Sequence, residues 1–111
     1  MMHDGTKRIV YNKLVRDKIP EIIETSGKMC TCETLPEDKY IVNLNIKLLE
    51  EVNEYLESGT VEELADICEV MHAILAFMNI PLAALESVRL EKHKERGGFE
   101  KRLLLKEVIE R

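Results

Sequence analysis

The sequence contains no tryptophan, and aromatic residues make up only 5% of its 111 residues. The core must therefore be built mainly from aliphatic side chains. Proteins that bind single-stranded nucleic acids usually stack the bases on aromatic side chains, which are scarce here. The net charge of −5 also disfavours binding through phosphate contacts, which depends on lysine and arginine. Nucleic acid is therefore not an expected partner.

Long apolar segments are absent too. A helix that crosses a bilayer needs about 20 consecutive apolar residues, and no run in the sequence approaches that length. The start of the chain, MMHDGTKR, lacks the apolar stretch of a secretory signal. Three cysteines are an odd number, which does not indicate a disulfide framework and suits a reducing compartment. These features predict a cytoplasmic protein without membrane contact.

Basic residues are missing from the middle of the chain. Residues 48–88 contain no lysine or arginine, and their eight glutamates and one aspartate give a charge of −9. Residues 1–47 carry +1 and residues 89–111 carry +3. Like charges four residues apart on a helix, such as Glu50 and Glu54, repel each other. We therefore expect a bound cation, or basic residues from the ends of the chain, to compensate the acidic middle.

Hydrophobic periodicity, prolines and glycines predict an all-α bundle of about four main helices. A short helix begins at Pro20 and stops at Gly27, and three longer ones cover about 36–58, 61–78 and 81–95. Residues 29–33 alternate weakly, as in a strand, and the structure of residues 99–111 is left open. We predict a single domain over residues 1–111. A helical chain this short often completes its core by forming an oligomer.

The two central helices have clear apolar stripes. The stripe of the first comprises Ile41, Leu44, Leu48, Val52 and Tyr55, and that of the second comprises Leu64, Ile67, Cys68, Met71, Ile74, Leu75 and Met78.

Acidic residues border both stripes. At 100° per residue, Glu50, Glu51 and Glu54 fall within an arc of about 100° beside the first stripe. Glu63 and Asp66 lie at the margin of the second. A short turn joins the helices, so they should pack antiparallel with their acidic arcs facing each other. Converging carboxylates repel and raise one another's pKa. Mg²⁺, which takes oxygen ligands, would remove that repulsion.

Simpler interpretations exist for these and other residues. Thr60-x-x-Glu63 fits a capping box at a helix start, and Glu50, Glu51 and Glu54 suit a solvated helix face. Glu69-x-x-His72 is one half of a di-iron signature whose second half is absent from the sequence. Cys30-x-Cys32 lacks the spacing of a zinc site. Cys68, within the apolar stripe, is expected in the core.

Four segments carry a family resemblance: KLVRDKIPEII at 13–23, KLLEEVNE at 47–54, EELADICEV at 62–70 and KERGGFEKR at 94–102. Together they make the chain resemble the MazG-like all-α nucleoside triphosphate pyrophosphohydrolases, and most closely the phosphoribosyl-ATP pyrophosphohydrolase-like branch. The segments occur in order and cover most of the chain. The interval from Glu54 to Glu63 is short compared with many MazG relatives.

The resemblance implies a MazG-like fold and Mg²⁺-dependent cleavage of a nucleotide between its α and β phosphates, with Mn²⁺ as a substitute ion. The products would be a nucleoside monophosphate and pyrophosphate. The substrate would be a nucleoside triphosphate in nucleotide house-cleaning, or phosphoribosyl-ATP. The resemblance also implies a homodimer in which helices of two chains complete the bundle. The alternative is a non-catalytic helical module that binds a nucleotide or a protein and keeps the acidic face.

The resemblance implies a role for individual residues of this chain. Glu50, Glu51, Glu54, Glu63 and Asp66 match the metal ligands, and Glu50 and Glu51 are the predicted catalytic residues. The basic ends of the chain then gain a role, because arginine and lysine bind phosphate. The predicted substrate-binding residues are Lys13, Arg16, Lys94 and Arg96. Alternatively, they form surface ion pairs with the acidic middle, and Gly97–Gly98 is simply a helix stop.

Overall fold

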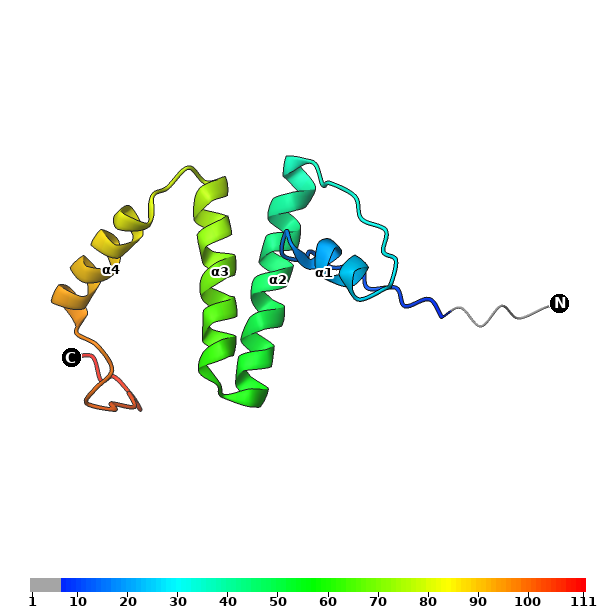
Figure 1. The fold of residues 1–111 in the computed structure, drawn as a ribbon. Coiled ribbons are helices and arrows are strands. Elements are labelled where there is room, and N and C mark those ends of the chain that lie inside the picture. Colours follow the sequence, from blue (N-terminus) through cyan, green and yellow to red (C-terminus); the bar gives the residue numbers. More distant parts are fainter. Residues whose placement is uncertain (1–6) are drawn as a thin grey trace.

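The computed structural model describes residues 7–111, which form four helices and no strand (Figure 1). The helices are α1 (Ile19–Thr25), α2 (Glu37–Ser58), α3 (Val61–Phe77) and α4 (Leu82–Arg96). The predicted all-α architecture is confirmed, and the bounds of the three long helices agree with the prediction to within one residue. The strand predicted at residues 29–33 is wrong. Within the described range no other segment pairs with it to form a hydrogen-bonded ladder.

Proline and glycine set the helix ends. Pro20 lies in the first turn of α1, where its missing N–H has no helical partner to lose. Pro36 and Pro81 precede α2 and α4 directly. Gly59 ends α2 in the left-handed conformation, with φ of 64°, and its N–H donates to the carbonyl of Tyr55 at 2.7 Å. The chain then turns at once into α3.

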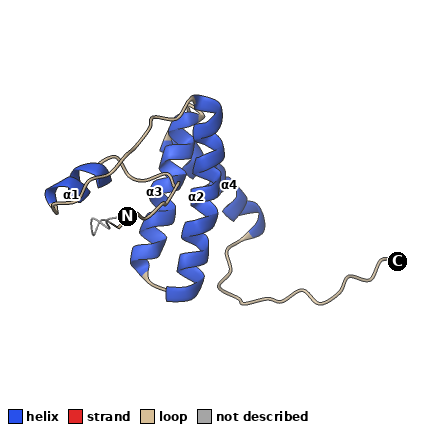
Figure 2. Cartoon of the chain, turned by 90° about the vertical axis from the view of Figure 1, so that its right-hand side faces the viewer, coloured by secondary structure: helices blue, strands red, loops and turns tan. Residues whose placement is uncertain are grey.

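Helices α2 and α3 form an antiparallel hairpin, as predicted, and lie side by side in both views (Figures 1 and 2). Leu44 of α2 is 2% exposed and Val70 of α3 is 8% exposed, and these are the buried hydrophobic residues of the described chain. At the open end of the hairpin the rings of Tyr40 and Phe77 pack edge to face, with centroids 6.0 Å apart. The predicted stripe of α2 is confirmed, because all its residues are buried or half-buried.

The predicted stripe of α3 is only partly correct. Leu64, Met71 and Met78 are 47%, 38% and 55% exposed, and Cys68 is exposed as well rather than in the core. The face that α3 turns towards α2 instead consists of half-buried and buried residues at helical spacing, namely Glu63, Asp66, Ile67, Val70, Ala73, Ile74 and Phe77. Because α3 is apolar on more than one side, periodicity alone does not determine which side packs inward.

Helix α4 and the C-terminal segment stand away from the hairpin. The chain bends by 111° between α3 and α4. After a turn at residues 99–101, the segment to Arg111 is extended and carries no regular structure (Figure 2). Its apolar side chains are largely exposed, for example Phe99 at 97% and Leu103 at 84%. Among residues 7–111 no single helix is long and apolar enough to cross a membrane, and α3 and α4 meet that criterion only as a bent pair.

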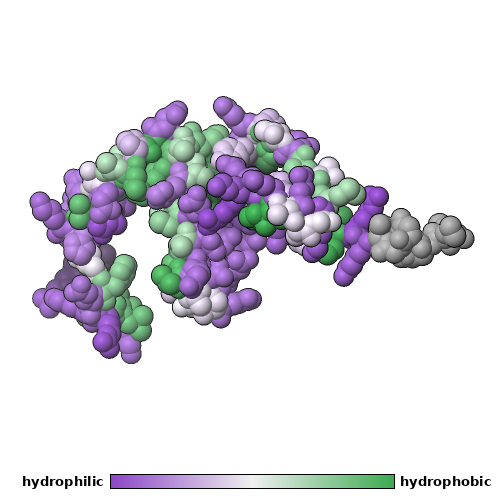
Figure 3. All heavy atoms as spheres, viewed as in Figure 1, coloured by the Kyte–Doolittle hydropathy of each residue, from purple (hydrophilic) through white to green (hydrophobic). Residues whose placement is uncertain are grey.

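The single chain exposes far more surface than a compact protein of its mass. Its accessible surface is 10857 Å², whereas a folded chain of 12.8 kDa exposes about 6,300 Å². The radius of gyration is 20.3 Å, against about 13 Å for a compact domain of this length. Apolar residues accordingly reach the surface on the visible face (Figure 3). One chain therefore buries little of the core that its sequence could form.

We expect Gly59→Ala to lower the free energy of unfolding by about 1–2 kcal/mol, because alanine is strained in the left-handed region. An added Cβ would meet no atom within 4 Å, so the cost comes from the backbone alone. Gly59→Asn is the matched control, since asparagine tolerates this conformation and should cost less. Urea unfolding followed by circular dichroism measures both variants. An alanine variant as stable as the wild-type protein would contradict this role of Gly59.

Candidate metal centre

Glu51 is the buried charged residue of the described chain, at 7% exposure. It lies on the face of α2 that packs against α3. Its Oε1 atom lies 3.5 Å from the Nζ atom of Lys47, one turn earlier on the same helix. Its Oε2 atom is buried and has no hydrogen-bond partner among the described residues. Leaving a buried acceptor unpaired costs about 1–3 kcal/mol, and more for a charged group. A proton or a cation at Oε2 would remove this cost.

Carboxylates from both helices gather around Glu51. Oxygen atoms of Glu50, Glu51 and Glu54 lie within 4.8 Å of one another, and so do oxygen atoms of Glu51, Glu63 and Asp66. Glu51 belongs to both groups and therefore links the acidic arcs of α2 and α3. The structure thus brings together all five carboxylates that the sequence analysis singled out. We refer to these five residues as the acidic cluster.

The capping-box interpretation of Glu63 is wrong. Thr60 does occupy the position before α3, but its side chain makes no capping hydrogen bond. The side chain of Glu63 lies in the acidic cluster, where its Oε2 atom is buried without a partner among the described residues. The cluster is also no solvated helix face, because Glu51 is buried and Glu50, Glu63 and Asp66 are half-buried.

Crowding shifts the pKa values of two carboxyl groups upward. Burial raises the pKa of Glu51, the nearby carboxylate of Glu54 raises it further, and the charge of Lys47 opposes these effects. Burial also raises the pKa of Glu63, helped by the charges of Glu54 and Asp66. Folding therefore makes both carboxyl groups easier to protonate.

Glu50 shows the opposite behaviour. Burial would raise its pKa, but hydrogen bonds and charges from Lys13 and Lys47 outweigh burial and lower it. The Oε1 atom of Glu50 lies 3.3 Å from Lys13 Nζ and 3.4 Å from Lys47 Nζ. Glu50 is therefore held in the ionised form at neutral pH.

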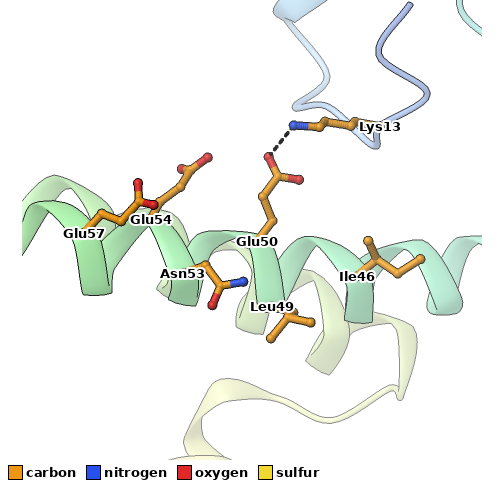
Figure 4. A pocket seen from close by; sticks show the side chains of 7 residues that line it. All are labelled: Lys13, Ile46, Leu49, Glu50, Asn53, Glu54 and Glu57. Carbon is orange, nitrogen blue, oxygen red and sulfur yellow. Dashed lines mark hydrogen bonds and ion pairs between the residues drawn. The ribbon is translucent and has the colours of Figure 1, made fainter.

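Basic residues from the N-terminal segment reach the acidic cluster. Lys13 pairs with Glu50 (Figure 4), and the guanidinium of Arg16 donates to Asp66 Oδ1 at 2.6 Å. The segment before α1 thus supplies part of the compensating charge expected from the ends of the chain. Both side chains are about half exposed, at 51% and 55%, so each has room to move to another anion.

The C-terminal basic residues are not brought to the acidic cluster. Lys94 and Arg96 lie in the last turn of α4, where they are exposed and favourably placed relative to the helix dipole. Neither forms an ion pair with a described residue. Gly97 ends the helix with φ of 80°. His72 is exposed, and its Nε2 atom lies 3.9 Å from Cys68 Sγ.

Sequence reasoning overlooked Lys47 and the groove beside the cluster. Lys47 precedes Glu50 and Glu51 by three and four residues, a spacing that already predicts ion pairs on a helix. The groove has a volume of about 380 Å³ and runs along α2 (Figure 4). It is lined by Lys13, Ile46, Leu49, Glu50, Asn53, Glu54 and Glu57.

The donor set fits a hard divalent cation. All five side chains offer carboxylate oxygens, which Mg²⁺ prefers, and two of those oxygens are buried without partners. Ligand oxygens of one Mg²⁺ lie about 3–4.2 Å apart, so carboxylate oxygens that lie within 4.8 Å of one another are near the spacing of a shared ion. Lys13, Arg16 and Lys47 balance three of the five negative charges. The two that remain equal the charge of one divalent ion.

Comparison with known proteins identifies one partial relative and no family. An uncharacterised protein of Mycolicibacterium smegmatis is 46% identical over 48 residues, which are 43% of this chain and 49% of that protein. The match thus spans about half the length of that relative. No family model and no solved structure matches the chain.

The raised pKa values lead to a prediction about stability. A carboxyl group whose pKa is raised by folding stabilises the protein below its unfolded pKa, and this contribution is lost as the pH rises through the folded value. In a chelator, the melting temperature should therefore fall as the pH rises above the ordinary carboxyl pKa of 4.5. Glu51→Gln should melt higher than the wild-type protein at pH 8 and respond less to pH.

Glu62→Gln is the matched control, because Glu62 is exposed and lies outside the acidic cluster. It should keep the pH response of the wild-type protein. Millimolar Mg²⁺ or Mn²⁺ should raise the melting temperature of the wild-type protein and of Glu62→Gln, but not of Glu51→Gln. A wild-type melting temperature that ignores both pH and metal would contradict this assignment.

Proposed function

We propose that the chain is a MazG-like, Mg²⁺-dependent pyrophosphohydrolase that cleaves a nucleotide between its α and β phosphates. The observation that carries this proposal is the acidic cluster around Glu51. The Oε2 atoms of Glu51 and Glu63 are buried without partners between α2 and α3. The groove and the half-exposed side chains of Lys13 and Arg16 lie beside the cluster. The family resemblance of the four sequence segments supplies the reaction type.

In this proposal Glu51, Glu63 and Asp66 hold the ion at the interface of α2 and α3. When bound, Mg²⁺ supplies Lewis-acid stabilisation of negative charge on the phosphate oxygens. Glu50 and Glu54 border the groove and accept hydrogen bonds from the attacking water. Water forms the new O–P bond in line with the bond that breaks, and its proton passes to a carboxylate. The bridging oxygen leaves with one phosphate-containing product.

In this proposal Lys13 and Arg16 bind the phosphates of the nucleotide. In the absence of substrate they pair with Glu50 and Asp66, and a nucleotide phosphate offers each a second anionic partner. Charge-assisted contacts of this kind are stronger than neutral ones. Lys94 and Arg96 are part of the proposal only if a second chain brings them to the cluster.

The proposal includes a homodimer. A chain that exposes 10857 Å² carries roughly 4,500 Å² more surface than a compact protein of its mass. Obligate homodimers bury about 1,000–2,500 Å² on each subunit, and this excess is large enough to contain such an interface.

One observation favours the alternative of a non-catalytic binding module. Three cations already neutralise part of the acidic cluster, as in a structural ion-pair network. Such a network would hold the N-terminal segment against the hairpin without any chemistry. Only the enzyme would hydrolyse a nucleotide, so a measurement of turnover decides between the two proposals.

The test is pyrophosphate release from a panel of nucleoside triphosphates, modified nucleotides and phosphoribosyl-ATP, with Mg²⁺ or with chelator. We expect metal-dependent release from at least one substrate. Glu51→Gln should reduce kcat by more than the 10- to 100-fold that loss of a hydrogen-bond partner of a metal ligand typically costs, whereas Glu62→Gln should retain activity. A folded protein that binds nucleotide and Mg²⁺ but releases no pyrophosphate would establish the binding module instead.

Arg16→Ala separates phosphate binding from charge neutralisation. If Arg16 binds a phosphate of the substrate, Arg16→Ala should raise KM roughly 10-fold. This change corresponds to about 1.4 kcal/mol, the contribution of one charge-assisted contact. Mn²⁺ affinity should hold or increase, because Asp66 loses a competing cation. Lys18→Ala, an exposed residue nearby in sequence that forms no ion pair among the described residues, is the control. Unchanged KM with tighter Mn²⁺ binding would assign Arg16 to neutralisation alone.

A further inference from the structure

Helix α2 has a second apolar face, directed away from α3. Four of its hydrophobic side chains are exposed by more than half: Val42 at 54%, Ile46 at 57%, Leu49 at 62% and Leu56 at 72%. With exposed Asn53 they follow one another at intervals of four, three, four and three residues. We call Val42, Ile46, Leu49, Asn53 and Leu56 the α2 seam.

The spacing of the α2 seam is that of a helix-packing interface. At 100° per residue its five positions fall within an arc of about 80°. The arc lies opposite the face that contains Leu44 and Glu51, which packs against α3. A helix that is apolar on two opposite faces is normally covered on both. Alternation of four and three residues is the heptad pattern of helices that pack along their length, and a single asparagine within such a pattern fixes register.

We propose that the α2 seam packs against the α2 seam of a second copy of this chain, with the two helices antiparallel. This inference rests on the homodimer of the proposed function, and it does not depend on the enzymatic activity. Contacts between two copies of one surface are the usual basis of two-fold symmetric dimers. The surplus surface described above supplies the area that such an interface requires.

Charge selects the antiparallel orientation. Residues 48–58 of α2 carry four glutamates and no basic residue, whereas residues 37–47 have no net charge. Parallel packing would set two acidic halves side by side, and antiparallel packing sets each against a neutral half. Lys39 and Glu57 both flank the same edge of the α2 seam, near opposite ends. Antiparallel packing centred near Leu49 brings Lys39 of one copy close to Glu57 of the other.

The α2 seam also borders the candidate metal centre. Ile46, Leu49 and Asn53 line the groove together with Glu50 and Glu54 of the acidic cluster (Figure 4). A second copy that packs on the α2 seam therefore covers the apolar wall of this groove.

The first test compares two substitutions of exposed leucines by glutamate. Leu49→Glu lies at the centre of the α2 seam, and Leu90→Glu lies on α4 at 50% exposure. Light scattering coupled to size exclusion should show a dimer for the wild-type protein and for Leu90→Glu. Leu49→Glu should weaken dimerisation by about 100-fold or more, since two-fold symmetry places the change at the interface twice. Circular dichroism verifies that both variants retain their helices.

The second test exchanges the charges of Lys39 and Glu57 and determines the relative orientation of the two α2 helices. Lys39→Glu and Glu57→Lys should each weaken the dimer by roughly 2- to 30-fold, because symmetry removes two exposed ion pairs. The double variant should regain wild-type affinity. This recovery requires antiparallel packing, and it stays measurable even if Leu49→Glu fails to fold.

Three outcomes overturn the inference. A wild-type protein that is monomeric at concentrations of tens of micromolar would reject both the homodimer and the α2 seam contact. A Leu49→Glu variant that dimerises like the wild-type protein leaves the homodimer intact and rejects this interface. A double charge variant weaker than either single variant rejects the antiparallel orientation. None of these readouts uses turnover, so they are distinct from a failure of the proposed chemistry.

Discussion

The structure depends on one buried carboxylate that has an unpaired oxygen. Glu51 lies in the interface of α2 and α3, which also contains the buried hydrophobic residues Leu44 and Val70. Its position obliges the hairpin to bring Glu63 and Asp66 of α3 close to Glu50 and Glu54 of α2. Such a cluster is unfavourable in an apolar interface unless protons or cations neutralise it. Packing α2 against α3 therefore also assembles the acidic cluster.

The second constraint is the small amount of core that one chain buries. Leu44 and Val70 are its buried hydrophobic residues, while apolar side chains on α2, α3, α4 and the C-terminal segment stay exposed. Lys13 and Arg16 tie the N-terminal segment to the hairpin through ion pairs that are partly exposed and individually weak. A second copy on the α2 seam would add the apolar contacts that these ion pairs do not provide.

The sequence was sufficient to predict the helices and the carboxylates that converge, because prolines, Gly59 and the apolar stripe of α2 are local signals. It was not sufficient to predict which side of α3 packs inward, since α3 is apolar on several sides and its contact face includes Glu63 and Asp66. The capping-box interpretation of Thr60 and Glu63 was also wrong. The local motif was present, but burial in the cluster determined the position of the Glu63 side chain. The positions of Lys94 and Arg96 depend on the bend before α4, which no local pattern encodes.

The most direct test of the central claim is a crystal structure of the protein grown with Mn²⁺, with the ion located by its anomalous scattering. We expect one strong peak between α2 and α3, within ligand distance of the Oε2 atoms of Glu51 and Glu63 and of a carboxylate oxygen of Asp66. An acidic cluster without a peak at saturating Mn²⁺, with Lys13, Arg16 and Lys47 still on its carboxylates, would show that the cluster is a structural ion-pair network.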